Sequence, residues 1–215
     1  MNVVAREVNA WGIVVAGGSG ARYGGLKQLA ELGGRRVLDH SLSALRTVCT
    51  GVVVVVPPDR VDEVVVDDAD AVVGGGDTRS ASVRSGLAAI GPDASHVLVH
   101  DAARPLASPA LCRRVVDALR LGADAAIPVV EVTDSLRTVD GKPVDRAGFV
   151  AVQTPQGFDV EVLREAHRSG EEASDDATLV DRLGRSVAHV EGDPTNLKIT
   201  EPHDLRLAEE LLDGR

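Results

Sequence analysis

Hydrophobic and polar positions follow one another along the chain in blocks that predict strands and helices in turn. Short apolar runs mark the strands, and the clearest is Gly51–Val56, which ends in five valines before Pro57. Such a run is typical of a strand buried on both faces, as in a parallel sheet. Apolar residues at helical spacing mark the helices, as in Arg36–Val48.

The other blocks predict more elements of the same two kinds. Strands are expected at Gly12–Ala16, Val72–Val73, His96–His100, Ala123–Val130 and Val187–Val190. Helices are expected at Ser80–Ile90, Ser108–Leu121, Asp159–Arg168, Asp175–Leu183 and Glu201–Leu212. The alternation predicts an α/β fold, with a parallel sheet covered by helices.

One segment breaks the alternation. Val132–Val139 and Arg146–Val152 both have strand-like composition, and Asp140–Gly141 between them is a hairpin-turn signal. No helical pattern separates the two strands. We therefore expect a single domain over residues 1–215, with a β-hairpin arm protruding at about residues 132–152.

Composition narrows the classes of function. The 215 residues carry a formal net charge of −10, which argues against broad binding to nucleic acid or to anionic membranes. No stretch approaches the ~20 apolar residues of a membrane helix. Met1–Ala10 lacks the apolar core of a signal peptide, so we expect a cytoplasmic protein.

The first candidate site is a glycine-rich loop, Ala16-Gly17-Gly18-Ser19-Gly20-Ala21-Arg22, which follows a predicted strand and precedes Lys27. Backbone N–H groups of such loops can bind phosphate, and Arg22 and Lys27 would add positive charge. A glycine turn beside two surface cations remains the alternative. The spacing fits neither a dinucleotide fingerprint, because Tyr23 replaces the third glycine, nor a Walker loop.

The second candidate is Asp101, at the end of the predicted strand that leads into Ala102–Pro105. Mg²⁺ binds in proteins through one or two carboxylates together with substrate phosphates, so Asp101 beside a phosphate loop is a candidate metal ligand. Alternatively, Asp101 pairs with Arg104 or caps a turn. His100 is expected to be structural.

Two further segments could complete a nucleotide site. Gly75, Gly76, Asp77 and Ser82 lie where a loop enters a helix and could admit a flat base, although Asp77 or Thr78 could simply cap that helix. Lys198, between apolar neighbours in a predicted strand, could point into the same crevice or lie exposed at an edge.

Ser174, Asp175 and Asp176 could be taken for a second metal site. We prefer a helix start, with Ser174 as the cap and the two acids in the first turn, where the helix dipole favours negative charge.

Five motifs occur along the chain in a fixed order: Ala16–Arg22, Lys27–Gln28, Val99–Pro105, Gln153–Gln156 and Asn196–Thr200. Together they resemble the 2-C-methyl-D-erythritol 4-phosphate cytidylyltransferases of the non-mevalonate isoprenoid pathway. The resemblance spans nearly the whole chain. It implies a Rossmann-like nucleotidyltransferase domain, a three-layer sandwich, and a homodimer joined by exchanged β-arms.

The resemblance also implies roles for single residues. CTP and the sugar-alcohol phosphate would be the substrates, and Mg²⁺ the cofactor, held by Asp101. The α-phosphate would be stabilised by Arg22, Lys27 and Lys198. The nucleotide would be bound by Ala16, Gly17, Gly18, Gly20, Gly76, Asp77, Ser82 and Ala102. The acceptor would be bound by Arg104, Ser135, Arg146 and Thr154, with Ser135 and Arg146 reaching across the dimer.

One departure concerns the loop over the triphosphate. Only residues 23–26 separate Arg22 from Lys27, which is shorter than is usual in the family. The motifs leave open D-ribitol 5-phosphate as the acceptor, and a non-catalytic nucleotide-binding protein. A dehydrogenase is disfavoured by the fingerprint mismatch.

Overall fold

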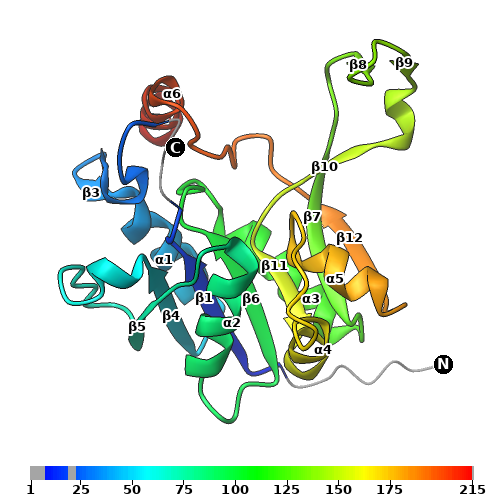
Figure 1. Ribbon diagram of the computed structural model, residues 1–215. Helices are drawn as coiled ribbons and strands as arrows, with labels where there is room; N and C mark the ends of the chain where they lie inside the picture. The colour runs from blue at the N-terminus through cyan, green and yellow to red at the C-terminus, as the bar shows by residue number, and fades with distance from the viewer. Residues whose placement is uncertain (1–7, 19–22, 215) are drawn as a thin grey trace.

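The computed structural model describes residues 8–18 and 23–214, and its centre is a twisted sheet (Figure 1). Within these residues, eight strands make up the main sheet: seven follow the order β10-β7-β11-β6-β1-β4-β5, and β12 pairs in parallel with β7. Helices cover both faces of this sheet, so the predicted α/β sandwich is confirmed.

The half of the sheet that leads to the candidate site is parallel, as the apolar runs predicted. It contains β1 (Ala10–Val15), β4 (Gly51–Val56), β5 (Ala71–Gly74) and β6 (His96–Asp101). In this half β1 is central, between β6 and β4. Their carboxyl ends therefore meet at one edge of the sheet, where open α/β sheets bind ligands.

The other half is mixed, which the sequence did not predict. It contains β7 (Ala125–Glu131), β10 (Val150–Val152), β11 (Gln156–Asp159) and β12 (Val187–Glu191). β11 runs antiparallel between β6 and β7. Its sequence is neither an apolar run nor an alternating one, so its neighbours, rather than its own pattern, make it a strand.

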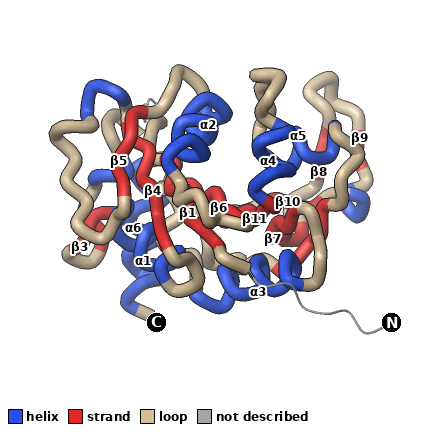
Figure 2. The backbone as a smooth tube through the Cα atoms, turned by 90° about the horizontal axis from the view of Figure 1, so that it is seen from below, coloured by secondary structure: helices blue, strands red, loops and turns tan. Residues whose placement is uncertain are grey.

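Two hydrophobic cores lie on opposite faces of the sheet, and the valines of β4 supply both in alternation. One core packs under α1 (Val37–Arg46) and α3 (Pro109–Arg120). The other packs under α2 (Arg79–Ala89), α4 (Val160–Ala166) and α5 (Asp176–Arg182). Figure 2 shows these two helical layers with the strands between them.

Shorter elements complete the fold. A small sheet of β2 (Glu31–Leu32) and β3 (Arg35–Arg36) lies near the closing helix α6 (Pro202–Asp213). Single 3₁₀ turns occupy Lys27–Leu29, Pro58–Arg60 and Arg146–Gly148. None of the helices in residues 8–18 and 23–214 combines the length and apolar character needed to cross a bilayer.

The segment predicted as two long hairpin strands is built differently. Only β8 (Leu136–Arg137) and β9 (Pro143–Val144) pair across the turn. Gly141 occupies that turn with φ of 90°, as the Asp140–Gly141 signal predicted. The expected strand from Arg146 starts instead as a 3₁₀ turn, and β10 then joins the main sheet. The part around β8 and β9 stands away from the body of the molecule in Figure 1.

Candidate active site

A cleft of about 390 Å³ lies at the carboxyl edge of the parallel strands. The ends of β1 and β6, the loop after β5 and the start of α2 line it. Predicted site residues that line it include Ala16, Gly17, Gly18, Lys27, Gly76, Asp77, Ser82, Asp101, Ala102 and Lys198. The fold thus brings together segments that are as far apart in the sequence as Ala16 and Lys198.

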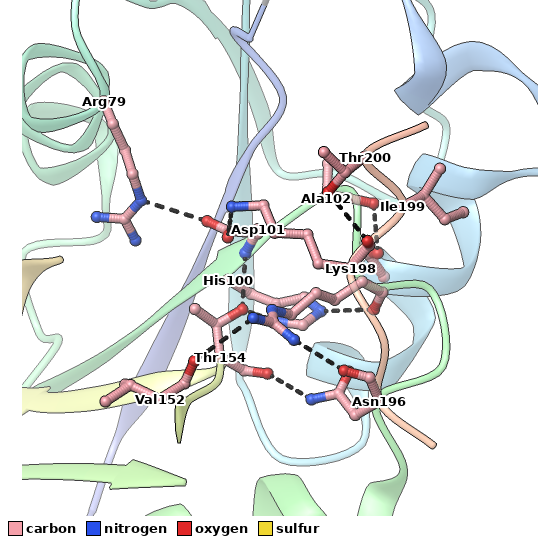
Figure 3. A network of polar contacts seen from close by, with 12 residues as sticks. Arg79, His100, Asp101, Ala102, Val152, Thr154, Asn196, Lys198, Ile199 and Thr200 are labelled. Carbon is pink, nitrogen blue, oxygen red and sulfur yellow. Dashed lines mark hydrogen bonds and ion pairs between the residues drawn. The ribbon is translucent and has the colours of Figure 1, made fainter. Parts of the chain in front are cut away.

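Asp101, the last residue of β6, lies in this cleft between two cations (Figure 3). Its Oδ2 accepts a hydrogen bond from Lys198 Nζ at 2.6 Å, and its Oδ1 accepts one from Arg79 Nε at 3.3 Å. Burial alone raises the pKa of Asp101, but the charges of Arg79 and Lys198 outweigh burial and hold the pKa well below its usual range. The carboxylate is therefore ionised at neutral pH.

Gln28 secures the start of the glycine loop. Its side chain is buried, and Nε2 donates to the carbonyl of Ala16 at 2.5 Å and to that of Gly18 at 3.3 Å. Gly17 lies close to Ser82, and a Cβ atom at position 17 would come within 3.3 Å of the Oγ of Ser82. The predicted residues Gly20 and Arg22 lie outside the described residues.

The lysines reach the cleft from two directions. Nζ of Lys27 donates to the carbonyl of Ile199 at 2.6 Å, which ties the loop to the segment that carries Lys198. That segment is an extended loop and not the predicted strand. It is fixed to the turn after β6 by the hydrogen bond from Ile199 N to Ala103 O at 2.8 Å.

The start of α2 forms another wall. Thr78 is its N-cap and accepts from Ala81 N at 3.0 Å, so of the two candidate caps Thr78 is the one used. Ser82 is buried, and its Oγ accepts from Gly76 N at 3.3 Å and donates to Thr78 O at 2.9 Å. Asp77 is exposed at the rim. This leaves Asp77 able to contact a ligand, whereas Ser82 shapes the loop.

A second polar network lies beside Asp101 in the interior (Figure 3). Oγ of Thr154 accepts from Asp101 N at 3.0 Å and lies 2.9 Å from His100 Nδ1. His100 Nε2 lies 3.1 Å from the carbonyl of Arg104, which can only accept. His100 is therefore a neutral Nε2–H tautomer, and burial lowers its pKa to about 4.

The four predicted acceptor-binding residues do not gather in the cleft of one chain. Thr154 is buried and its hydroxyl is engaged in the interior network. Arg104 donates from Nη1 to Asn196 O at 2.8 Å, while its Nε is buried with no partner among the described residues. Ser135 and Arg146 are exposed on the hairpin segment, where Arg146 donates to the carbonyl of Thr133.

Sequence reasoning missed two residues of the site. Arg79 was assigned no role from the sequence, yet it contacts Asp101. Asp176 was assigned to a helix start, with Ser174 as the cap; instead Asp175 caps α5, and Asp176 is fully buried against Arg79. The sequence did carry a signal for Asp176. Two consecutive aspartates stand at the start of α5, and the helix needs only one of them as its cap.

Comparison with known proteins agrees with this geometry. Residues 11–214 match the family model described as 2-C-methyl-D-erythritol 4-phosphate cytidylyltransferase. A protein of that name from Nocardia farcinica is 43% identical over 100% of this chain and 99% of the relative. Another from Rhodococcus jostii is 44% identical over 94% of both.

The chain belongs to the 2-C-methyl-D-erythritol 4-phosphate cytidylyltransferase family. The resemblance inferred from the motifs is thereby confirmed, as is the assignment as a nucleotidyltransferase. A solved structure of a family member from Thermus thermophilus is 42% identical and superposes with a TM-score of 0.82, over 97% of this chain and all of the other. The cytidylyltransferase fold therefore extends over essentially the whole chain.

Proposed function

We propose that this cleft transfers CMP from CTP to 2-C-methyl-D-erythritol 4-phosphate, which releases pyrophosphate and forms 4-diphosphocytidyl-2-C-methyl-D-erythritol. The observation that carries the proposal is the arrangement around Asp101. A buried, ionised carboxylate is joined to Lys198 and Arg79 at the edge of the sheet where a glycine loop begins. Lys27 lies in the lining of the same cleft.

Charge explains why such a site suits this reaction. A phosphate monoester is an anionic nucleophile, so attack on the α-phosphorus of CTP needs no strong general base. The barrier comes from bringing two anions together in an in-line geometry. Positioned cations lower this barrier, and we assign that role on the α-phosphate to Lys27 and Lys198, with Arg22 expected as a third cation.

The residues around Asp101 fit a Mg²⁺ ion that enters together with the triphosphate. Within residues 8–18 and 23–214, no group of three or more His, Cys, Asp or Glu side chains is placed to hold a metal. One carboxylate plus substrate phosphates is a common Mg²⁺ site, and Asp101 would supply that carboxylate. Bound Mg²⁺ would neutralise negative charge on the phosphate oxygens. Lys198, which pairs here with Oδ2 of Asp101, would then contact the substrate phosphates.

The hairpin segment supports a homodimer in which each copy completes the other's acceptor site. Phe149 and Val150 are 53% and 43% exposed, and Val139 at the tip is fully exposed. Exposed apolar side chains on this segment favour a protein interface there. Ser135 and Arg146 lie on the same segment and would reach the sugar-alcohol phosphate of the partner subunit.

The acceptor is tested by measuring pyrophosphate release from CTP with each candidate in turn. We expect rapid release with 2-C-methyl-D-erythritol 4-phosphate and little with D-ribitol 5-phosphate or without an acceptor. The reverse preference would assign the ribitol reaction. Tight CTP binding with no release for any acceptor would favour a non-catalytic nucleotide-binding protein.

A further inference from the structure

A buried carboxylate behind the cleft, Asp176, holds Arg79 in the position from which it contacts Asp101. Oδ2 of Asp176 accepts from Arg79 Nη1 at 2.6 Å. Its Oδ1 lies 2.9 Å from His167 Nε2, and because a carboxylate only accepts, His167 is the donor. Nε of Arg79 then reaches Oδ1 of Asp101 at 3.3 Å. A continuous line of polar contacts thus joins α5 to the cleft through α2.

Asp176 and Arg79 are both held in their charged forms. Burial alone raises the pKa of Asp176, but the hydrogen bond from His167 and the charge of Arg79 outweigh burial and lower the pKa below its usual range. Arg79 in turn keeps its charge, because Asp176 and Asp101 outweigh its own burial and raise its pKa. One arginine is therefore shared between two ionised carboxylates.

Stability alone is a poor reason for this arrangement. The attraction within a buried ion pair often fails to repay the loss of hydration, and apolar residues of similar size are frequently as stable. Nη2 of Arg79 is also buried without a hydrogen-bond partner in the described part of the chain. Charged groups that are buried at such cost beside a cleft are more often functional.

We propose that Asp176 is a positioning residue that acts through Arg79 on Asp101. Arg79 holds Oδ1 of Asp101 while Lys198 holds Oδ2, so the carboxylate cannot rotate without losing an ion pair. When Lys198 turns to the substrate, Arg79 is the group that keeps Asp101 in place. Asp176 keeps Arg79 from following the incoming phosphates. The inference rests on the proposed function and adds Arg79 and Asp176 to its machinery.

The test is a double-mutant cycle on kcat in the pyrophosphate-release assay. Asp176→Asn keeps the shape of the side chain and removes its charge. We expect kcat to fall roughly 10- to 100-fold, as for other residues that orient a ligand from behind, while the KM for CTP changes less than about threefold. In an Arg79→Gln background the same change should lower kcat by less than about twofold, because its target is gone.

Asp175→Asn is the matched control. Asp175 caps α5 by accepting from Thr178 N at 2.8 Å, and Asn caps equally well, so kcat should stay within about twofold of wild type. The thermal midpoint of each variant reports whether it folds. If Asp176→Asn does not fold, Arg79→Lys is measured instead, because it keeps the charge but loses the guanidinium group that bridges Asp176 and Asp101. Arg79→Lys should lower kcat by about the factor expected for Asp176→Asn, and its thermal midpoint should stay near that of wild type.

Three results would overturn the proposal. They are a kcat of Asp176→Asn within twofold of wild type, losses that multiply independently in the Arg79→Gln background, and normal turnover of Arg79→Lys where that variant is needed. A wild-type protein without turnover would contradict the proposed function itself, so the two failures are distinguishable.

Discussion

Asp101 and His100 are consecutive in β6 but face different surroundings, and their charge states differ accordingly. Asp101 meets two cations and is held ionised. His100 is fully buried between Thr154 and the carbonyl of Arg104 and is held neutral. The sequence motif alone predicted that the aspartate carries chemistry and the histidine does not. It could not show which cations pair with Asp101, because Arg79 and Lys198 are 22 and 97 residues away.

His100 makes the stability of the protein depend on pH. In the unfolded chain its pKa returns to about 6.5, whereas burial holds it at about 4 in the folded state. As pH falls from 6.5 to 4, the unfolded state binds a proton that the folded state does not, so stability is lost over this window. The contribution is on the order of 3 kcal/mol.

We therefore expect His100→Gln to lose less unfolding free energy than wild type between pH 7 and pH 4. Urea denaturation at several pH values, in buffer without divalent cations, measures this difference. His189→Gln is the control, because His189 is exposed on β12. Parallel pH curves for wild type and His100→Gln would show that His100 is not the group responsible.

Elements that bury an apolar pattern of their own were predictable. The valine run of β4 and the capped start of α3, where Ser108 accepts from Leu111 N, lie where the sequence placed them. β11 was not predictable, because Gln156–Asp159 has a mixed composition and becomes a strand by pairing with β6 and β7. The hairpin was half predictable, since the turn signal was right but the strand lengths were not.

The hairpin gives a prediction at the scale of the element. If Phe149 and Val150 lie in a dimer interface, the double variant Phe149→Ser with Val150→Thr should shift the protein from dimer to monomer and lower turnover. Sedimentation velocity measures the change in mass. Leu121→Ser is the control, since Leu121 is 69% exposed and lies at the end of α3, outside the hairpin segment. A dimer that survives the double variant unchanged would contradict the role of the hairpin.

At the scale of the whole molecule, a few cations act against an acidic background. The net charge is −10, yet Lys27, Arg79 and Lys198 line one cleft. Only the fold brings them together, through the bond from Lys27 to Ile199 and the ion pair of Lys198 with Asp101. The family motifs predicted Lys27 and Lys198 as site residues, but not Arg79. Arg79 and its buried partner Asp176 emerge only from contacts between α2 and α5.

The most direct test of the account is the turnover of Lys198→Ala with CTP and 2-C-methyl-D-erythritol 4-phosphate, measured together with its affinity for CTP. Loss of one positioned cation should cost on the order of 3 kcal/mol in the barrier, or ~10²-fold in kcat, with a much smaller effect on CTP binding. Arg120→Ala, an exposed cation on α3, serves as the control and should turn over normally. Near-normal turnover of Lys198→Ala would contradict the assignment of catalysis to this cleft.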